Sequence, residues 1–451
     1  MKPSILKGTR DFTPEMVRKR NFIFNTIREV FELFGYEPIE TPTMESLATL
    51  TGKYGDEGDQ LLFKVLNNGD YLSKADESAL EARDSNKLTF SISKRGLRYD
   101  LTVPFARFVV MHQNDIAFPF KRYQIQPVWR ADRPAKGRYQ EFYQCDVDVV
   151  GSDSLMYEAE LVQIYDQVFQ RLGLKVAIRY NNRKILAGMA EAAGIKERFA
   201  EMSVAIDKLD KVGMDGVKKE LLDRGIPEAA LSPIEQMLQA DSLETLEALI
   251  QESETGRKGI AEIRQMLGFL ETYSPTNEVQ FDPTLARGLT YYTGCIFEVA
   301  ALDAEMGSIG GGGRYDDLTG IFGLQDVSGV GVSFGAERIY DVMESLDLFP
   351  PETGSKLQLI FVTFDEATHR FAFDWATRLR AAGIVAEVYP DPVKMKKQMK
   401  YANARQAPFV AIIGDKELEG QVAAVKNMAT RTQETYSFEA LQALLLSSGS
   451  H

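Results

Sequence analysis

The sequence predicts an α+β protein in three parts: a strand-rich domain with an antiparallel sheet flanked by helices, an all-helical insertion, and a C-terminal α/β domain. Residues 120–130 and 139–150 alternate polar and apolar types in period two, which indicates a long antiparallel hairpin. Helical patterns fill 183–275, and strands alternate with helices after Pro350. We therefore expect the domains to span 1–182 with 276–348, then 183–275, and lastly 356–446.

Composition narrows the class of protein. The chain has 451 residues, of which 44% are hydrophobic and 26% charged, as in ordinary globular proteins. Its net charge of −13 argues against a protein that coats nucleic acid without specificity. No apolar run is long enough to span a membrane, and the opening MKPSILKGTR lacks the pattern of a signal peptide. We expect a cytoplasmic protein that does not enter membranes.

Few residues suit metal binding or histidine-based catalysis. The chain has only three histidines, and its two cysteines do not form a C-x-x-C pair. A His-based triad and a zinc site are therefore not expected, and no metal ligand is assigned. Charge stabilisation in any reaction would come from Arg, Lys, a metal ion or backbone dipoles.

The N-terminal part begins with an amphipathic helix over 14–34, which starts at Thr13-Pro14-Glu15 and ends at Gly35. An extended segment and strands over 60–66 and 88–99 are expected to follow. LRYDLTVP then turns from strand into helix at Pro104. Asp100 and Thr102 share one face there. They can hold an ammonium group or cap the helix, and the sequence leaves both open.

The hairpin at 120–150 carries the clearest chemical signal. Its loop, RADRPAKGR, is cationic, and its return strand places polar and aromatic groups on one face. The residues concerned are Arg130, Asp132, Arg133, Lys136 and Arg138 in the loop, and Phe142, Gln144, Asp146 and Asp148 in the strand. Such a set suits a phosphorylated ligand with a planar base. The alternative is a solvated hairpin with ordinary cross-strand ion pairs.

The decapeptide LARGLTYYTG at 285–294 places Arg287 before a glycine and two tyrosines. Its continuation LTYYTGCIFEV reads as a strand, on which Tyr291 and Tyr292 would face opposite sides. Local sequence alone leaves open whether Arg287 binds a ligand or forms a buried structural ion pair. The glycine run Gly310–Gly313 offers backbone amides to a ligand, or simply a tight turn.

Residues 329–339, GVGVSFGAERI, predict a strand that runs into a helix. The glycine spacing and the lack of an early βαβ unit argue against a dinucleotide-binding motif. Arg338 lies in the first turn of the helix, where a cation is electrostatically disfavoured, and this favours a ligand as its partner.

The C-terminal α/β domain has a slight excess of basic residues, unlike the rest of the chain. Its helix VKMKKQMKYANAR carries a set of basic residues: Lys394, Lys396, Lys397, Lys400 and Arg405. Tyr401 is placed for stacking on a base. The helix is either a nucleic-acid contact, with salt-dependent binding, or a solvated amphipathic helix.

Together, these segments resemble motifs 1, 2 and 3 of the class II aminoacyl-tRNA synthetases: the helix and TP-ended strand, the arginine-loop hairpin, and the glycine strand with its arginine helix. LARGLTYYTG and GGGGRYD are similar to two segments specific to histidyl-tRNA synthetases. KGTRDF and GRYQEFYQCDVDVVG resemble the eukaryotic-like branch of that family. The likeness covers nearly the whole chain.

The resemblance implies a class II catalytic domain and a C-terminal anticodon-binding domain in a symmetric homodimer. It implies that L-histidine and ATP form histidyl-adenylate, with Mg²⁺ bound through the β- and γ-phosphates, and that the histidyl group then passes to tRNA(His). The implied catalytic residues are Arg287 and Arg130. Arg287 would stabilise the charge that develops on the α-phosphate.

The same resemblance implies a role for each matching residue. Histidine would be bound by Asp100, Thr102, Arg130, Gln144, Asp148, Arg287, Tyr291 and Tyr292, with Asp148 and Tyr292 on the two imidazole nitrogens. ATP would be bound by Arg130, Asp132, Arg138, Phe142 and Arg338, with adenine between Phe142 and Arg338. Thr290 stands where the family usually has Asp, and we expect it to support the pocket from outside.

Two other functions are compatible with this fold. One is a non-catalytic paralogue, like the regulatory subunit of ATP phosphoribosyltransferase, which would sense histidine. The other is a synthetase for another amino acid of the same subclass. The C-terminal domain and the two family-specific segments argue against the first, and the two segments argue against the second.

Overall fold

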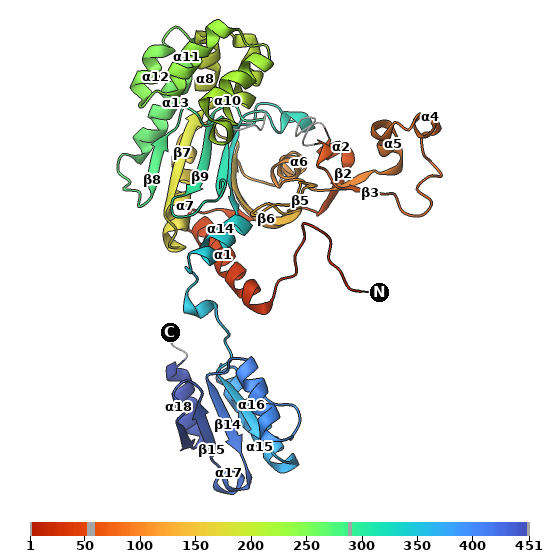
Figure 1. Cartoon of the computed structure of the whole chain (residues 1–451), viewed down its shortest axis with the longest axis vertical. Coiled ribbons are helices and arrows are strands. Elements are labelled where there is room, and N and C mark those ends of the chain that lie inside the picture. Colours follow the sequence, from red (N-terminus) through yellow and green to blue (C-terminus); the bar gives the residue numbers. More distant parts are fainter. Residues whose placement is uncertain (1, 52–58, 287–290, 449–451) are drawn as a thin grey trace. The chain divides into compact units, whose positions relative to one another are not determined.

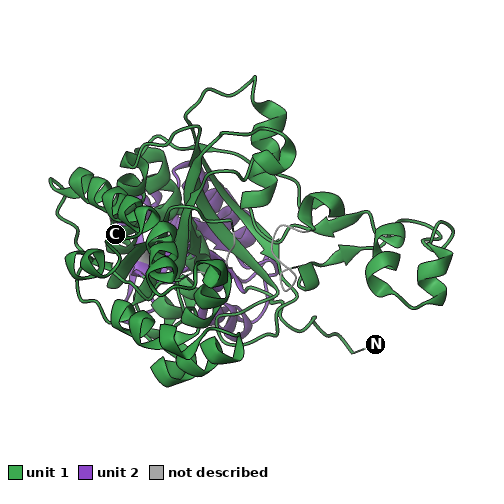
Figure 2. Cartoon of the chain, turned by 90° about the horizontal axis from the view of Figure 1, so that it is seen from above, with its two compact units in different colours: residues 1–12, 19–349 green, residues 13–18, 350–451 purple. Residues whose placement is uncertain are grey.

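The computed structural model describes residues 2–51, 59–286 and 291–448. They form two compact units, residues 1–12 with 19–349 and residues 13–18 with 350–451 (Figure 2). The predicted α+β class is confirmed: the first unit is built on an eight-stranded sheet of order β1-β5-β6-β11-β10-β9-β7-β8 (Figure 1). Its strands are β1 (Glu37–Pro38), β5 (Phe120–Trp129), β6 (Glu141–Val150), β7 (Val176–Asn182), β8 (Glu278–Phe281), β9 (Cys295–Ala301), β10 (Gly310–Tyr315) and β11 (Gly329–Gly335).

The predicted hairpin is confirmed, and its two faces differ. β5 and β6 pair antiparallel from Phe120 opposite Val150 to Trp129 opposite Glu141. On one face, apolar side chains pack under helices of the first unit, and the Phe334 ring lies 4.8 Å from that of Tyr165. The opposite face carries Gln144, Asp146 and Asp148 by the two-residue period of the strand. The helices beside this sheet are α1 (Pro14–Leu33), α6 (Thr102–His112), α7 (Met156–Arg171) and α14 (Ala336–Ser345).

The glycine run is a strand and not a turn. β10 lies between β9 and β11 and pairs antiparallel with both. A Cβ atom at Gly312 would lie 2.1 Å from the carbonyl oxygen of Gly331, so a side chain there would force the two strands apart. The turn and the amide cradle considered from sequence are both wrong, because the backbone amides of this run serve the sheet.

A small three-stranded sheet, β2 (Met44–Ser46), β4 (Arg95–Leu97) and β3 (Lys64–Val65), adjoins α2 (Leu47–Leu50), α4 (Glu77–Glu81) and α5 (Ser85–Ile92). These elements form an arm that extends from the large sheet (Figure 1). The predicted strand over 88–99 is mostly wrong. Its first half is the helix α5, which Asp84 caps by accepting from the Lys87 N–H at 3.1 Å.

The sequence between β7 and β8 is helical, as expected. It contains α8 (Arg183–Ala192), η1 (Lys196–Arg198), α9 (Phe199–Ile206), α10 (Leu209–Asp223), α11 (Glu228–Leu238), α12 (Leu243–Leu249) and α13 (Glu254–Leu270). Glycines let α8 and α13 approach closely, since a Cβ at Gly188 would lie 2.6 Å from the Gly256 Cα. The bounds 183–275, like the other domain limits, remain a prediction.

The second unit contains a five-stranded sheet of order β13-β12-β14-β15-β16. β12 runs parallel to β13 and β14, as in an α/β domain. The elements are β12 (Leu359–Thr363), α15 (Glu366–Ala381), β13 (Ala386–Val388), α16 (Met395–Ala404), β14 (Phe409–Ile413), α17 (Asp415–Gly420), β15 (Ala423–Asn427), β16 (Gln433–Tyr436) and α18 (Phe438–Ser448). Two short 3₁₀ helices are also present: η2 (Gly320–Phe322) in the first unit and η3 (Pro351–Thr353) in the second. Among the described helices, none is long and apolar enough to cross a membrane.

Candidate active site

A cavity of about 610 Å³ opens on the polar face of the large sheet. Its walls come from the β5–β6 hairpin, the start of α6, β10, β11 and the start of α14. The predicted histidine- and ATP-site residues that the structure describes all line it: Asp100, Thr102, Arg130, Asp132, Arg138, Phe142, Gln144, Asp148, Tyr291, Tyr292 and Arg338. Arg287 and Thr290, on which part of the prediction depends, lie outside the described residues.

Arg130, which directly follows β5, is held by the backbone and by two aromatic rings. Its Nε donates to the carbonyl oxygen of Tyr99 at 3.0 Å. The guanidinium carbon lies 4.3 Å from the Tyr99 ring centroid and 5.1 Å from that of Phe142. A guanidinium fixed in this way is preorganised to bind a carboxylate or phosphate.

The hairpin loop is tied to the helix that follows β11. Arg338 donates from Nε to the carbonyl oxygen of Gly137 at 2.9 Å and from Nη1 to that of Ser308 at 2.6 Å. Near the two ends of the loop, Nη1 of Arg138 lies 3.8 Å from Oδ1 of Asp132. Arg338 therefore has protein acceptors that offset its unfavourable place in the first turn of α14, and a ligand is not required to explain it.

Asp100 and Thr102 lie at the N-terminus of α6. The Asp100 Oδ1 accepts from the Val103 N–H at 3.1 Å, so its side chain pairs with a first-turn donor as the capping alternative expects, although the N-cap position itself is Leu101. The helix begins at Thr102, two residues before the expected Pro104. Since both residues also line the cavity, the cap fixes the Asp100 carboxylate at its wall.

The floor of the cavity holds two buried carboxylates, Asp146 and Asp148, on β6. Asp148 Oδ1 accepts from the Tyr315 hydroxyl at 2.6 Å, and Oδ2 lies 2.8 Å from Nη2 of Arg122. Gln144, also on β6, donates to the Ser333 hydroxyl at 3.1 Å. Because strand alternation aligns these groups on one face, the floor is a polar surface inside an otherwise apolar sheet.

Burial controls the ionisation of this floor. It raises the pKa of Asp146 to about 7, while the positive charge of Arg122 acts in the opposite direction. Burial also raises the pKa of Asp148, and there Arg122 and the hydrogen bond from Tyr315 oppose the rise. The pKa of the Tyr315 hydroxyl is raised well above its usual value, first by burial and then by the charge of Asp148. Tyr315 therefore stays a donor at neutral pH.

Gly331 of β11 makes room for Asp148. It pairs with Asp148 across the strands, and a Cβ there would lie 2.0 Å from the Asp148 Oδ1 and 2.3 Å from its Cγ. Any side chain at 331 would displace the carboxylate from this position.

The two tyrosines of LARGLTYYTG lie before a strand and not in it. β9 begins only at Cys295, so the expectation that strand alternation separates Tyr291 from Tyr292 is wrong. Their ring centroids lie 4.7 Å apart, and both residues line the cavity. Gly294 interrupts the alternation that favoured a longer strand.

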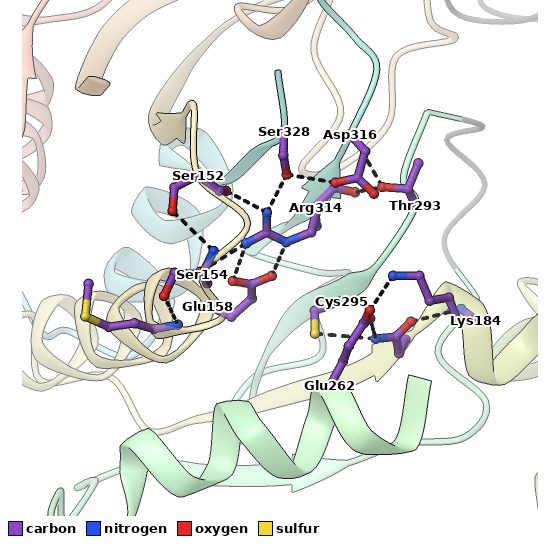
Figure 3. A network of polar contacts seen from close by, with 12 residues as sticks. Ser152, Ser154, Glu158, Lys184, Glu262, Thr293, Cys295, Arg314, Asp316 and Ser328 are labelled. Atoms are coloured by element: carbon purple, nitrogen blue, oxygen red, sulfur yellow. Dashed lines mark hydrogen bonds and ion pairs between the residues drawn. The ribbon is translucent and has the colours of Figure 1, made fainter. Parts of the chain in front are cut away.

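A buried ion pair holds this segment against the sheet (Figure 3). Arg314 of β10 contacts Glu158 of α7, with Nη2 and Oε2 at 2.7 Å. The Arg314 carbonyl oxygen accepts from the Thr293 N–H at 2.8 Å, and the Thr293 hydroxyl accepts from the Asp316 N–H at 3.1 Å. Since Thr293 directly follows the two tyrosines, the pair fixes the backbone that presents them to the cavity.

Several residues of the site were not assigned from the sequence. Tyr315, Ser333 and Glu298 line the cavity, and Arg122 lies behind Asp148. Asp146 lines it too, and the sequence had named it on the hairpin face without giving it an individual role. The two-residue period had placed Asp146 on the correct face, and this was a usable signal. The others come from strands whose neighbours and register follow from the fold of the whole sheet and cannot be read from local sequence.

The basic helix of the second unit is only partly as expected. Lys394, Lys396, Lys397 and Lys400 are exposed. Tyr401 donates its hydroxyl hydrogen to Glu387 at 3.0 Å and packs edge-on against Tyr389, and Arg405 also pairs with Glu387. Tyr401 is therefore held in place by contacts within the domain, and its stacking on a base stays a prediction.

An antiparallel sheet with an arginine-bearing hairpin, and with a late glycine strand that leads into an arginine-bearing helix, defines a class II aminoacyl-tRNA synthetase catalytic domain. Residues 70–339 match the family model described as histidyl-tRNA synthetase, and residues 356–447 match the anticodon binding domain. The histidine–tRNA ligase of Bacteroides fragilis (strain YCH46) is 55% identical over 445 residues, which cover 98% of each chain. The chain belongs to the histidyl-tRNA synthetase family.

Solved structures agree on the fold. The crystal structure of histidyl-tRNA synthetase from Nostoc sp. PCC 7120 matches with a TM-score of 0.82 at 28% identity, over 99% of this chain and 100% of that one. A Bacillus halodurans structure described as an ATP phosphoribosyltransferase regulatory subunit/histidyl-tRNA synthetase matches with a TM-score of 0.72 over 92% of this chain and 99% of that one. At 22% identity, that likeness shows the fold alone.

The expected place in the eukaryotic-like branch is not supported. The relatives that share half or more of their residues with this chain are bacterial, for example those of Bacteroides fragilis and Phocaeicola vulgatus.

Proposed function

We propose that this chain is a histidine–tRNA ligase, which joins L-histidine to tRNA(His) through a histidyl-adenylate and releases AMP and diphosphate. The carrying observation is that one cavity brings Arg130 and Phe142 together with Asp148 and Tyr292. The first pair suits a phosphate and a planar base, and the second suits an imidazole. Identity of 55% to a histidine–tRNA ligase over nearly the whole chain supports the same activity.

In the first step, a carboxylate oxygen of histidine attacks the α-phosphorus of ATP, and the bond to diphosphate breaks. Arg130 contacts both the histidine carboxylate and the α-phosphate in this proposal, which aligns the two reactants. Phe142 stacks on the adenine, with Arg338 on its other side, while Asp132 and Arg138 complete the ATP site. No protein base is required, because the attacking carboxylate is already ionised.

Arg287 is proposed as the residue that stabilises the charge developing on the α-phosphate. Its place in LARGLTYYTG, next to the two tyrosines that line the cavity, supports this role. A preorganised guanidinium stabilises the transition state more than the ground state. In the second step, a 3′-terminal hydroxyl of tRNA attacks the histidyl carbonyl carbon, and AMP leaves.

Histidine is proposed to bind through three sets of contacts. Asp100, Thr102 and Gln144 hold the α-ammonium group. Asp148 accepts an imidazole N–H, Tyr292 bonds the other ring nitrogen, and Tyr291 completes the pocket. A buried carboxylate that lacks its donor is strongly unfavourable, and amino acids without a matching N–H are therefore rejected.

Mg²⁺ is proposed to bind through the β- and γ-phosphates of ATP. Within the described ranges, no group of three or more His, Cys, Asp or Glu side chains could hold a metal ion. Mg²⁺ prefers substrate phosphates and one or two carboxylates, and Glu298 of β9 is a carboxylate at the cavity. Glu298 would help to hold such an ion, which would supply positive charge to the leaving diphosphate.

The remaining assignments extend the proposal to the whole chain. Residues 356–446 would bind the anticodon, with Lys394, Lys396, Lys397, Lys400 and Arg405 as candidate tRNA contacts. The active form would be a homodimer. The cytoplasm would be its location, which is consistent with Cys145 and Cys295 being free and buried.

The assignment of the imidazole site can be tested with Asp148→Asn. Since the amide keeps the size but loses the charge, we expect kcat/KM for histidine in ATP–diphosphate exchange to fall by about 10- to 100-fold, the effect of one charged hydrogen bond. The KM for ATP should change little. A variant whose KM rises for ATP alone would refute the assignment.

A further inference from the structure

Arg122 is an unusual residue for the position it occupies. It lies on β5 directly opposite Asp148 of β6, and its side chain is 0% exposed. Its guanidinium carbon lies 4.1 Å above the Phe105 ring centroid, and Nη2 lies 2.8 Å from the Asp148 Oδ2. Asp148 lines the cavity, whereas Arg122 does not. Arg122 therefore meets the site only through the carboxylate.

The hydrogen bonds of Arg122 do not explain why it is buried. Nε and Nη1 have no acceptor among the described residues, and the short approach of Nη2 to Oδ2 lacks the alignment of a hydrogen bond. A guanidinium carries five N–H donors, and burial without acceptors is strongly unfavourable. An apolar side chain would pack on Phe105 without this penalty. What Arg122 supplies, and an apolar side chain would not, is a positive charge beside the carboxylate of Asp148.

The charges around the floor confirm that such a contribution matters. The titratable groups that interact with Asp146 or Asp148 are Arg122 of β5, Arg98 directly after β4, Tyr315 of β10, Asp100 before α6, Cys145 of β6 and Tyr36 before β1. Arg122 is the cation of this set whose charge acts on both Asp146 and Asp148. Of these two carboxylates, Asp148 is the one it touches.

We propose that Arg122 is a positioning residue for the selection of histidine: its guanidinium keeps Asp148 ionised and balances the charge, so that the carboxylate accepts an imidazole N–H from a neutral ring. The inference rests on the proposed function, because it assumes that Asp148 meets the imidazole. It assigns to a residue outside the cavity the task of setting the hydrogen-bonding state of the cavity floor.

The physical argument has two parts. Without Arg122, burial would favour the protonated carboxyl group of Asp148, and one of its oxygens would become a donor instead of an acceptor. An ionised Asp148 without a balancing charge would instead favour an imidazolium, so the site would recognise a cation and not the hydrogen-bonding pattern of neutral histidine. With Arg122 and the Tyr315 hydroxyl in place, each carboxylate oxygen keeps a lone pair for the substrate.

The test compares Arg122→Met with Arg122→Lys, which keeps a charge, and with Lys121→Met. Lys121 is the adjacent cation on β5, but it points to the opposite face, where it pairs with Glu160 at 2.7 Å. It is therefore a control for the loss of one positive charge from the same strand. Each variant is assayed as the full chain by ATP–diphosphate exchange, with KM for histidine and for ATP measured between pH about 6.5 and 8.5 and expressed relative to wild type.

We expect Arg122→Met to raise KM for histidine by about 10- to 100-fold near pH 7, as for one lost charged hydrogen bond. Because the pKa of Asp148 would rise without Arg122, the defect should shrink as the pH increases. KM for ATP should stay within about twofold, Arg122→Lys should recover most of the histidine affinity, and Lys121→Met should match wild type. If Arg122→Met does not fold, Arg122→Gln replaces it, because it also removes the charge.

The inference is overturned if the neutral variant keeps the wild-type pH profile of KM for histidine. It is also overturned if histidine and ATP are affected equally at every pH, or if Arg122→Lys is as impaired as the neutral variant, since these results describe a structural role. A wild-type chain whose exchange does not depend on histidine would instead refute the proposed function.

Discussion

Gly331→Ala is a small change whose effect on the site can be worked out from the structure. The new Cβ would lie 2.0 Å from the Asp148 Oδ1 and 2.8 Å from the Val147 carbonyl oxygen. Van der Waals contact begins near 3.5 Å, and the backbone partner is fixed in the β6–β11 ladder, so the carboxylate has to retreat by about 1 Å or more. That movement draws Asp148 away from Arg122 and Tyr315, and away from the proposed imidazole position.

A displacement of about 1 Å in a binding group typically costs on the order of 100-fold. We therefore expect kcat/KM for histidine to fall by about 100-fold in ATP–diphosphate exchange, with KM for ATP nearly unchanged. Gly335→Ala is the matched control, because it lies on the same strand and face and its Cβ comes no closer than 3.3 Å to any atom. Wild-type use of histidine by a folded Gly331→Ala variant would refute the role given to Asp148.

Further predictions concern catalysis, tRNA binding, assembly and stability. Arg287→Ala should lower the exchange rate by about 10²–10³ while histidine and ATP still bind, and a folded variant with a near wild-type rate would make Arg287 a structural ion-pair residue. A chain that ends after residue 350 should keep exchange but lose efficiency in charging tRNA(His), and equal losses in a folded truncation would contradict a separate anticodon domain. Sedimentation at micromolar concentration should give the mass of a dimer, and a monomer would contradict the proposed assembly. Arg314→Met should lower the free energy of unfolding by about 3–5 kcal/mol, because it leaves Glu158 buried and unpaired, whereas the double change with Glu158→Met should cost less; urea unfolding measures both.

Elements with a strong local pattern were predictable from the sequence. The β5–β6 hairpin and its polar face follow from a two-residue period sustained over ten residues in each strand. The alternation of Leu88, Phe90 and Ile92 wrongly favoured a strand. The Asp84 side chain caps a helix here, and the sequence did not show that this helix is more stable than a strand. Short segments of this kind are settled by caps and by tertiary contacts.

The candidate site shows the same division. Residues on the hairpin and beside glycines were assigned from patterns and from resemblance, and the structure brings those it describes into one cavity. Arg122 and Tyr315 were not predicted as site residues. They belong to the site because they contact Asp148, and this contact depends on the strand order β5-β6-β11-β10. Strand order and register are properties of the whole sheet and leave no local signal.

The most direct test of the central claim is amino-acid-dependent ATP–diphosphate exchange by the purified chain with each of the twenty amino acids in turn. Because the floor of the cavity holds a buried carboxylate that is proposed to accept an imidazole N–H, histidine alone should support exchange, and charging should then be found with tRNA(His). Exchange that depends on another amino acid, or histidine binding without any exchange, would contradict the account.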